Sequence, residues 1–359
     1  MYDIAVVGLG PAGSFLIRHL SGNYRVIAID RKSPDDNSGF HKPCGGLLAP
    51  DAQKSLSCFN MTLPKDILVS PQIFSVRTID VKTGLIRHYQ RHYINLDRRK
   101  FDQWLMKQIP EHIEVHNNAV CTNVLRDGEG FRVTYVKNGE SRTVCAKYLV
   151  GADGAASIVR RALYKDFHIH AYLSIQQWFA DVHRTPFYSC IFDSELTDSY
   201  AWGITKDDHF VFGGAFSTGT GQRDFETLKE KLRRYDFKLD EPLKTEACLV
   251  LRPFGLRNYC YGSNGAFLIG EAAGFISPSS LEGISYAIDS GYLLSQCLND
   301  TAHNPNREYR KVTRKIRTKL FSKYVKRFFM YNQSSRKLIM KSGIMSIPML
   351  NSESCKPGS

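Results

Sequence analysis

The sequence of 359 residues has few of the features that mark secreted, metal-binding or membrane-spanning proteins. Its nine cysteines form no CxxC pair, and none joins a histidine at zinc-binding spacing, so we expect reduced thiols and no metal site. The first residues lack the basic segment of a signal peptide. No uncharged apolar run reaches the roughly 18 residues of a membrane-spanning helix. These absences predict a cytoplasmic protein.

A glycine-rich turn lies near the N-terminus. The motif GLGPAG places Gly8, Gly10 and Gly13 between an apolar run, YDIAVV, and a predicted helix, SFLIRHL. Gly8 permits the tight turn, Gly10 lets a pyrophosphate approach the backbone, and Gly13 lets helix and strand pack closely. The second predicted strand, YRVIAID, ends at Asp30, whose carboxylate can accept hydrogen bonds from a ribose 2′-OH. This order predicts a dinucleotide site, with the pyrophosphate at the positive end of the helix.

Two later segments repeat the combination of strand, glycine and acid. KYLVGADGAAS is a predicted strand followed by Asp153 and Gly154, and AFLIGEAAG is a predicted strand followed by Gly270 and Glu271. A long helix is predicted to start near Glu282. An NAD-binding domain does not need three such turns spread along the chain, whereas FAD is long enough to contact all of them. The three turns together therefore predict FAD as the cofactor.

The three turns, in this order, resemble those of FAD-dependent oxidoreductases with the p-hydroxybenzoate hydroxylase fold. Within that group, four segments are similar to the geranylgeranyl reductase family, and most closely to its CbrA-like members: KPCGG, LDRRKFDQWL, SYAWGITK and GEAAGFISPSSLEGISYAIDSG. The resemblance implies an α/β fold, α+β overall. A Rossmann-like FAD-binding domain would join an antiparallel-sheet substrate domain and a C-terminal helical segment.

The same resemblance implies a discontinuous domain organisation. We expect the FAD-binding domain to comprise residues 1–70, 97–163 and 252–300. Residues 71–96 and 164–251 would form the substrate domain. The basic C-terminal helical segment would then cover residues 301–359.

The resemblance also assigns cofactor contacts to residues of this sequence. Ala12 and the three glycines would hold the pyrophosphate, Arg98 would lie along the ribityl–phosphate chain, and the backbone at Cys121 would contact the adenine. Gly283 and Ile284 would present N–H groups to the flavin edge that becomes negative on reduction, as donors at a helix start can. The full set of expected FAD contacts is Gly8, Gly10, Ala12, Gly13, Asp30, Cys44, Gly45, Arg98, Cys121, Asp153, Gly154, Glu271, Gly274, Gly283 and Ile284.

Two places depart from the family's usual pattern. Glu271 stands where an aspartate is usual, and because the longer side chain keeps its acceptor, we expect a shifted contact and retained binding. Gly203 and Thr205, in YAWGITK, stand where the family commonly has WxFPK. The second departure leaves the substrate-side geometry open.

Between residues 164 and 251, short runs rich in aromatic and β-branched residues alternate with turns, which predicts a mainly antiparallel sheet. Four aromatic residues are candidate walls of an apolar substrate pocket, with ordinary core packing as the alternative for each: Trp178, Tyr200, Trp202 and Phe212. Lys206 is a candidate substrate anchor, and a solvated surface lysine is the alternative. An aromatic sheet over a flavin suits a planar or isoprenoid substrate.

The loop HKPCGGLLAP follows the second predicted strand, where this fold brings the chain past the flavin. In the related reductases a Cys-Gly turn lies there, so Cys44 and Gly45 are expected flavin neighbours. The Cys44 thiol is our candidate catalytic group, as a proton donor or substrate contact, and packing beside the flavin is the alternative. A thiolate needs a positive neighbour at neutral pH, which Lys42 or a helix dipole could supply.

Positive charge is concentrated near the C-terminus. Residues 307–341 contain thirteen Lys and Arg and a single acid, Glu308, and so hold +12 of the net charge of +13. Apolar residues recur in this region at helical spacing: Val312, Ile316, Leu320, Tyr324, Phe328 and Tyr331. A basic amphipathic helix suggests an anionic membrane surface, and a helix packed on the FAD-binding domain is the alternative. Nucleic acid is disfavoured because no recognition module accompanies the charge.

These observations predict an FAD-dependent oxidoreductase that reduces carbon–carbon double bonds of an isoprenoid or lipid-like substrate by hydride transfer from flavin N5. An FAD-dependent aromatic monooxygenase and a membrane-associated flavoprotein electron carrier are the alternatives. No second GxGxxG motif is present, so we expect an external electron donor, NAD(P)H or a redox protein, that docks transiently. We expect a cytoplasmic enzyme with peripheral contact to the inner membrane surface.

Overall fold

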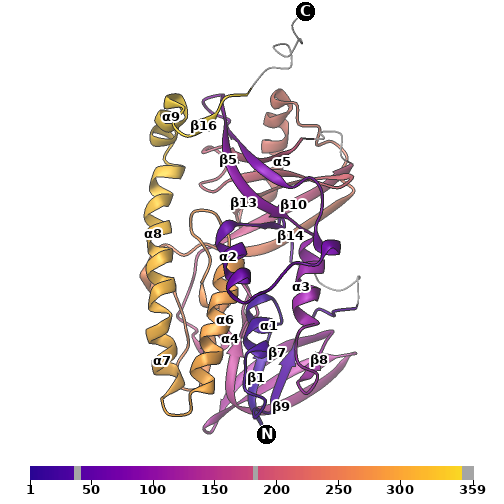
Figure 1. The fold of residues 1–359 in the computed structure, drawn as a ribbon, viewed down its shortest axis with the longest axis vertical. Helices are drawn as coiled ribbons and strands as arrows, with labels where there is room; N and C mark the ends of the chain where they lie inside the picture. The colour runs from indigo at the N-terminus through magenta and orange to yellow at the C-terminus, as the bar shows by residue number, and fades with distance from the viewer. Residues whose placement is uncertain (36–41, 181–184, 350–359) are drawn as a thin grey trace, which may run out of the picture.

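The computed structural model describes residues 1–35, 42–180 and 185–349. Two β-sheets lie toward opposite ends of the molecule, and a row of helices runs along one edge from the first sheet to the second (Figure 1). This row comprises α7 (Pro305–Val312), α8 (Arg314–Tyr331) and α9 (Gln333–Ser342). The mixed α/β fold class predicted from the sequence is confirmed.

The first sheet contains the N-terminal strand. Its strand order is β6-β2-β1-β9-β8-β7, and β15 also pairs with β9. The strands are β1 (Tyr2–Val7), β2 (Val26–Ile29), β6 (Glu114–His116), β7 (Ala119–Asp127), β8 (Gly130–Lys137), β9 (Glu140–Gly151) and β15 (Ala266–Leu268). The pairs β1–β2, β1–β9, β2–β6 and β9–β15 are parallel, whereas β7, β8 and the first half of β9 are antiparallel. The run VIAI of β2 is buried throughout, as central parallel strands are.

Helices α1 (Pro11–Arg18) and α6 (Ile284–Asn299) pack closely against each other beside this sheet. A Cβ on Gly291 of α6 would lie 2.4 Å from the carbonyl oxygen of Ala12, so only glycine permits this approach. Further helices of the chain are α2 (Pro50–Cys58), α3 (Arg98–Met106), α4 (Ile158–Leu163) and the 3₁₀ turns η1 (Lys65–Ile67), η2 (Arg233–Tyr235), η3 (Leu256–Asn258) and η4 (Gly270–Ala273).

The second sheet has the strand order β14-β10-β13-β12-β11-β4-β5-β16, and β3 pairs with β5. Its strands are β3 (Leu47–Leu48), β4 (Ile73–Asp80), β5 (Leu85–Asn95), β10 (Ala171–Ala180), β11 (Phe187–Phe192), β12 (Ala201–Lys206), β13 (His209–Ser217), β14 (Lys244–Leu251) and β16 (Ser346–Ile347). Neighbouring strands are antiparallel except β4 and β11, which are parallel. Helix α5 (Gly221–Leu232) packs Phe225 and Leu228 on one face.

The apolar stripe that predicted one C-terminal helix is divided among separate helices. Thr313 lies between α7 and α8 with its hydroxyl bonded to the Tyr309 carbonyl at 2.7 Å, and the extended Asn332 caps α9. Ile316 and Leu320 are buried in the core of the first sheet, whereas Phe328 is 56% exposed. The stripe therefore packs on the protein at Ile316 and Leu320 and again at its end, where the Tyr331 hydroxyl donates to the Ser279 carbonyl at 2.7 Å.

Ion pairs hold the later part of this row against the second sheet. Arg327 of α8 pairs with Asp198 at 3.1 Å, and Arg336 of α9 pairs with Asp80 of β4 at 2.6 Å. Among the helices of the described ranges, none is long and apolar enough to cross a membrane.

Candidate cofactor site and the aromatic face

The three glycine turns meet at one edge of the first sheet. Strands β1, β9 and β15 are parallel neighbours, and the turns that start at Gly8, Ala152 and Gly270 follow their carboxyl ends. A Cβ on Gly270 would lie 2.9 Å from the Cβ of Ala12, so the first and third turns are in contact. Ligands of open α/β sheets bind outside this carboxyl edge.

The glycines of the first turn have different surroundings. A Cβ on Gly8 would lie 2.5 Å from the Ala152 oxygen, and one on Gly13 would lie 2.0 Å from the Gly8 oxygen, so packing requires both glycines. Around Gly10, the nearest described atom is Nζ of Lys32, at 3.8 Å from the Cβ position. Gly10 is the N-cap of α1 and makes no side-chain cap bond. This open helix start suits a pyrophosphate.

Asp30 follows β2 and braces the glycine turn. Its carboxylate accepts hydrogen bonds from the backbone N–H groups of Leu9 and Lys32. An ionised carboxylate offers about four acceptor positions. Asp30 can therefore hold the turn and still accept a hydrogen bond from a ribose hydroxyl.

Asp153 follows β9 and has one oxygen without a partner. Its Oδ2 accepts from the Ile158 N–H at 2.7 Å, at the start of α4. Its Oδ1 is buried and has no hydrogen-bond partner among the described residues, and burial raises the pKa of this carboxyl. Gly154, with a φ of +74°, has no described atom within 4 Å of its Cβ position. An orphaned acceptor beside open backbone fits a bound dinucleotide.

Cys121 lies in β7 opposite Tyr135, where the register of the strand pair shifts before Asn123. Burial raises the pKa of its thiol to about 12, so the thiol stays protonated at neutral pH. The contact of the Cys121 backbone with an adenine stays a prediction.

A buried charge network surrounds Arg98, the first residue of α3. Arg98 Nε pairs with one oxygen of Asp102 at 2.9 Å, and Lys32 Nζ pairs with the other at 3.1 Å. Burial opposes these charges, but attraction within the network dominates, raising the pKa of Arg98 and lowering that of Asp102. The side chain of Cys44 lies close enough to Arg98 to contribute to this rise. Arg98 is thus a positive neighbour of the thiol.

Lys42 and Glu271 form an ion pair across the site. The other carboxylate oxygen of Glu271 accepts from the Leu251 N–H at 2.9 Å. Burial opposes the charge on Lys42, but Glu271 outweighs it and raises the pKa of Lys42. Lys42 is therefore neutralised by Glu271, and Arg98 is the other cation near the Cys44 side chain.

The loop that carries Cys44 lies over one face of β12. A Cβ on Gly45 would lie 2.9 Å from Ile204 Cδ1 and 3.6 Å from Trp202 Nε1, and one on Gly46 would lie 2.7 Å from Lys206 Nζ. These three β12 residues alternate along the strand and so point to the same face. This face of the second sheet therefore meets the loop that leaves the first.

Three of the four aromatic candidates share that face. The ring centroids of Tyr200 and Trp202 are 5.9 Å apart, and the register of β10, β13 and β12 places Trp178 farther along the same side. The indole N–H of Trp202 is buried and has no acceptor among the residues described. Phe212 lies on the opposite face, where it stacks on Phe225 of α5 with centroids 5.3 Å apart. The structure does not bring Phe212 to the other three.

Lys206 is 5% exposed and is therefore not a solvated surface lysine. Its ammonium donates to Asn95 Oδ1 at 2.7 Å and to the Leu96 carbonyl at 2.8 Å. Burial lowers its pKa to about 8. Because an ammonium has three N–H donors, these contacts use two of them.

Gly283 and Ile284 form the start of α6. Gly283 is the N-cap and makes no side-chain cap bond, and the atoms nearest its Cβ position belong to Ile276, at 3.6 Å. The N–H groups here are therefore open to a ligand. Gly274 differs, because its φ is +81° and a Cβ would lie 2.6 Å from the Asn258 oxygen. Gly274 is a glycine because the end of η4 requires one.

Glu282, which precedes this helix start, was not among the expected site residues. Its carboxylate lies close to the side chains of Tyr93 and Ser280, and burial raises its pKa. Tyr200 donates to the Ser280 carbonyl at 2.6 Å, so a single loop joins the acid to the aromatic face. Sequence patterns did not reveal that Glu282, Tyr93 and Tyr200 lie near one another, because these residues are far apart in the sequence. The available signal was an acid directly before Gly283.

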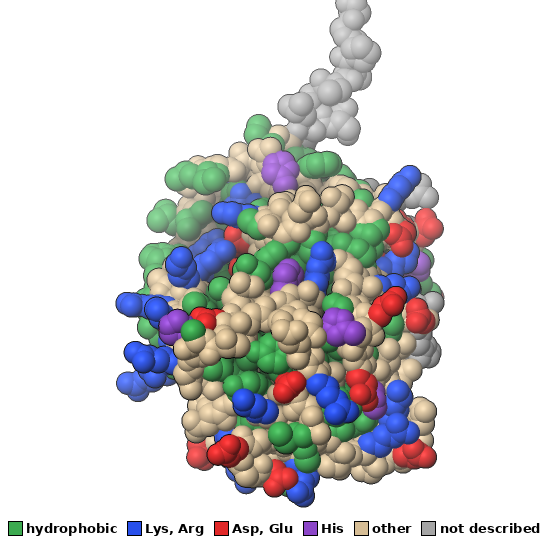
Figure 2. Space-filling model, turned by 60° about the horizontal axis from the view of Figure 1, so that its bottom comes forward, with side chains coloured by type: hydrophobic (Ala, Val, Ile, Leu, Met, Phe, Trp, Pro, Cys, Tyr) green, Lys and Arg blue, Asp and Glu red, His purple; other side chains and the backbone are tan. Residues whose placement is uncertain are grey.

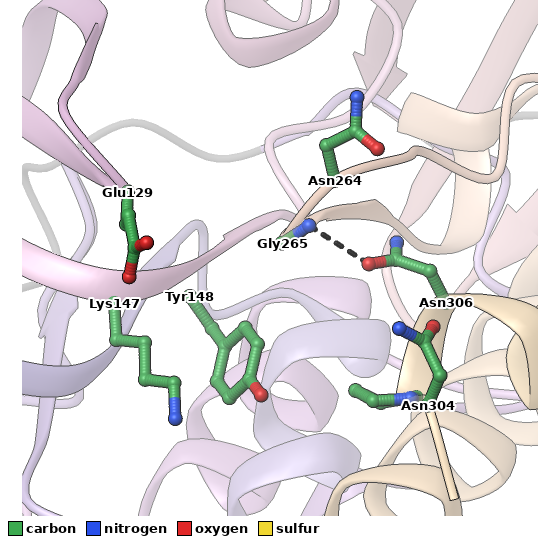
Figure 3. Close-up of a pocket in the computed structure, with 8 residues that line it drawn as sticks. Glu129, Lys147, Tyr148, Asn264, Gly265, Asn304 and Asn306 are labelled. Atoms are coloured by element: carbon green, nitrogen blue, oxygen red, sulfur yellow. Dashed lines mark hydrogen bonds between the residues drawn. The ribbon is translucent and has the colours of Figure 1, made fainter.

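A separate polar pocket lies at the opposite edge of the first sheet (Figure 3). Lys147, Tyr148 and Gly265 line it at the start of the parallel segments of β9 and β15, and the Gly265 N–H donates to Asn306 Oδ1 at 2.8 Å. The other lining residues are Glu129, Asn264, Asn304 and Pro305. Because cofactors bind at the carboxyl edge, this pocket is not the dinucleotide site.

The comparisons with known proteins agree with this geometry. Residues 76–304 match the FAD-binding domain family. Protein CbrA of Escherichia coli K12 is 49% identical over 349 residues, which cover 97% of this chain and 99% of that protein. Protein CbrA of Shigella sonnei is 50% identical, with the same coverage.

Solved structures share the fold at lower identity. A geranylgeranyl bacteriochlorophyll reductase-like protein from Thermoplasma acidophilum has a TM-score of 0.78 at 20% identity, over 99% of this chain and 94% of that one. PqsL, a probable FAD-dependent monooxygenase from Pseudomonas aeruginosa, has a TM-score of 0.67 at 15% identity, over 96% and 99%. The chain therefore belongs to the FAD-binding domain family, together with the CbrA proteins, and is an FAD-dependent oxidoreductase.

Proposed function

We propose that this oxidoreductase reduces carbon–carbon double bonds of an isoprenoid or lipid-like substrate. The observation that carries the proposal is the aromatic face of β12, where Trp202 lies beside Tyr200 and beneath the Gly45 turn. An apolar face next to a flavin suits a substrate with an alkene and few polar groups. The fold shared with a geranylgeranyl bacteriochlorophyll reductase-like protein supports the same substrate class.

In this proposal, the turns of the first sheet and the start of α6 hold the cofactor, and the Gly45 turn lies between it and the second sheet. The open backbone at Gly10 receives the pyrophosphate, Asp30 receives a ribose hydroxyl, and the N–H groups of Gly283 and Ile284 face the flavin edge that becomes anionic. Bound FAD supplies the hydride for one alkene carbon. The chain's own task is to orient the alkene, exclude water and deliver a proton to the other carbon.

Two side chains could deliver that proton. Our candidate is Cys44, because its loop contacts the aromatic face and because Arg98 is a positive neighbour of its side chain. Glu282 is the rival donor, since burial raises its pKa and keeps its proton at higher pH than an ordinary carboxyl would. Single variants of the two residues separate these roles.

Anaerobic turnover tests the proposal. The FAD-loaded protein is reduced with dithionite under argon and mixed with a prenyl diphosphate, and we expect a product heavier by two hydrogens per reduced bond. A product that needs oxygen and carries a new oxygen atom would instead show a monooxygenase. An unchanged substrate, with transfer of electrons to a protein acceptor, would show an electron carrier.

Variants at the proton donor complete the test. We expect Cys44→Ala to lower turnover by about 10²-fold or more, the usual effect of removing a general acid, while the flavin absorbance stays normal. Cys44→Ser is the matched control for packing. Undiminished turnover in both variants would exclude Cys44 as the proton donor and leave Glu282 as the candidate.

The electron donor and the place of action complete the proposal. Because the chain has one GxGxxG motif, we propose an external donor, NAD(P)H or a redox protein. We also propose that the protein works in the cytoplasm at the inner membrane surface. The net +12 of residues 307–341 supports contact with anionic lipids.

A further inference from the structure

Helix α8 has two apolar stripes, and one of them faces away from the protein. Ile316 and Leu320 face inward and are buried. The outer stripe lies at positions i, i+4, i+7 and i+8, which share one side of a helix. It consists of Phe321, Val325, Phe328 and Phe329, which are 41%, 43%, 56% and 57% exposed.

The outer stripe continues beyond α8 into α9 and the segment that follows. We call the complete set the apolar ridge: Phe321, Val325, Phe328, Phe329, Leu338, Ile339, Ile344, Met345, Ile347 and Met349. These are ten of the eighteen exposed large hydrophobic side chains in the described ranges. Single exposed apolar residues are ordinary, but such a concentration marks an interaction surface.

The charge around the ridge is of one sign. Residues 309–349 contain twelve Lys and Arg and no Asp or Glu. Lys326, Lys337 and Lys341 are exposed beside ridge residues. Figure 2 shows Lys and Arg side chains projecting from the edge of the molecule that carries the helical row. The partner must therefore be both apolar and anionic.

We propose that the apolar ridge inserts into the interface of an anionic bilayer, with α8 and α9 lying in the membrane plane and the lysines contacting lipid head groups. A monotopic amphipathic helix combines these two contacts. A second copy of the chain would instead bring its own exposed lysines, Lys326, Lys337 and Lys341, against these, so like charges oppose dimerisation through the ridge.

In this proposal, the membrane-bound helix α8 lies next to the proposed active site. Lys323 and Lys326, on α8, lie close enough to Glu282 to influence its titration. The helix that would contact the bilayer therefore also borders the loop joined to the aromatic face. Any role of this arrangement in catalysis rests on the proposed lipid-like substrate, whereas the insertion itself does not.

Vesicle binding tests the insertion with the FAD-loaded full chain. We expect the protein to sediment with vesicles of phosphatidylglycerol and phosphatidylethanolamine, and only weakly with phosphatidylcholine. The variant Phe328→Ser/Phe329→Ser should bind at least tenfold more weakly. Phe74→Ser is the matched control, because Phe74 is 65% exposed on β4, outside the ridge. In the variant Phe329→Trp, brominated lipid chains should quench the fluorescence of the introduced tryptophan.

Three outcomes would overturn the proposal. The first is that the unchanged protein does not sediment with anionic vesicles, and the second is that the double serine variant binds them as well as the unchanged protein does. The third is that light scattering shows a dimer of the unchanged protein and a monomer of the double serine variant. The vesicles contain no substrate, so they test the insertion separately from the anaerobic assay with a prenyl diphosphate. Vesicle binding together with no alkene reduction in that assay would refute the proposed function alone. Reduction of a short prenyl diphosphate without vesicle binding would refute the insertion alone.

Discussion

At the residue scale, Gly10 offers a sharp test of the FAD site. Its φ is −68°, which any residue adopts, and its Cβ position is open. We therefore expect Gly10→Ala to fold normally, while the added methyl group occupies the place where the pyrophosphate approaches the backbone. FAD titration should show binding weaker by more than about tenfold, with an unchanged melting temperature for the FAD-free protein.

Gly8→Ala is the contrasting variant. The φ of Gly8 is +100°, and a Cβ would lie 2.5 Å from a backbone oxygen. The fold itself should lose stability, by about 1–3 kcal/mol. Normal FAD binding by Gly10→Ala would show that the pyrophosphate lies elsewhere.

The buried Lys206 should make the free energy of unfolding depend on pH. Its pKa is lowered to about 8 by burial, whereas an unfolded lysine titrates near 10.5. Between these values the unfolded chain binds more protons than the folded one, so the free energy of unfolding rises with pH, by about 3 kcal/mol over the window. Lys206→Met should lack this rise. Urea unfolding at pH 7 to 10.5 measures the difference.

The slope with pH is the informative readout, because the methionine also leaves Asn95 and the Leu96 carbonyl without their donor. Lys337→Met, which removes an exposed lysine, controls for the general loss of a charge. If Lys206→Met kept the same slope as the unchanged protein, the lysine would not titrate near pH 8.

At the element scale, the features that could be predicted from the sequence are those that depend on short local patterns. The strand, glycine turn and helix predicted at residues 2–18 are present in the structure, because Gly8 and Gly13 serve local backbone geometries that the pattern encodes. The face toward which a strand side chain points was harder to predict. Seven consecutive residues of β13 are buried, so both faces are covered, and alternation did not reveal that Phe212 points to α5.

Long-range contacts were also beyond the sequence. Tyr93 and Glu282 come together only because β5 and the loop before α6 meet in the fold. The division of the C-terminal stripe has a similar cause. Tertiary contacts bury Ile316 and Leu320, whereas Phe328, with the same helical spacing, is 56% exposed.

We expect the Arg336–Asp80 ion pair to anchor α9 to the second sheet. The two side chains are 7% and 0% exposed, and α9 has no large apolar face on the sheet. Arg336→Met would leave Asp80 buried without its counter-ion, which should lower the free energy of unfolding by about 3–5 kcal/mol. We expect limited proteolysis to cut within residues 333–347 before the rest of the chain.

Lys337→Met is again the matched control, because it is the neighbouring residue and is exposed. The double variant Asp80→Asn/Arg336→Met should recover part of the loss, since no unpaired charge remains. Equal stability of Arg336→Met and Lys337→Met would show that the pair does not anchor the helix.

At the scale of the whole molecule, the proposed FAD contacts come from distant parts of the chain. The first turn and the start of α6 are more than 260 residues apart in sequence, and the Gly45 turn touches the second sheet. In the proposed site, these separate parts of the chain would contact a single ligand at the junction of the two sheets. Binding of FAD should therefore stabilise both sheets at their junction, and not the first sheet alone.

Amide hydrogen exchange with and without FAD tests this coupling. Ligand at 100 times its Kd stabilises the bound form by about 2.7 kcal/mol, or about 100-fold in the rate of the openings that it opposes. We expect slower exchange in the first turn, in residues 43–46 and at the start of α6. Helix α5 should be unchanged, because it packs through Phe212 on the far face of the second sheet. The Gly10→Ala variant should show no protection anywhere. Protection confined to residues 8–14 would contradict a site that both sheets build.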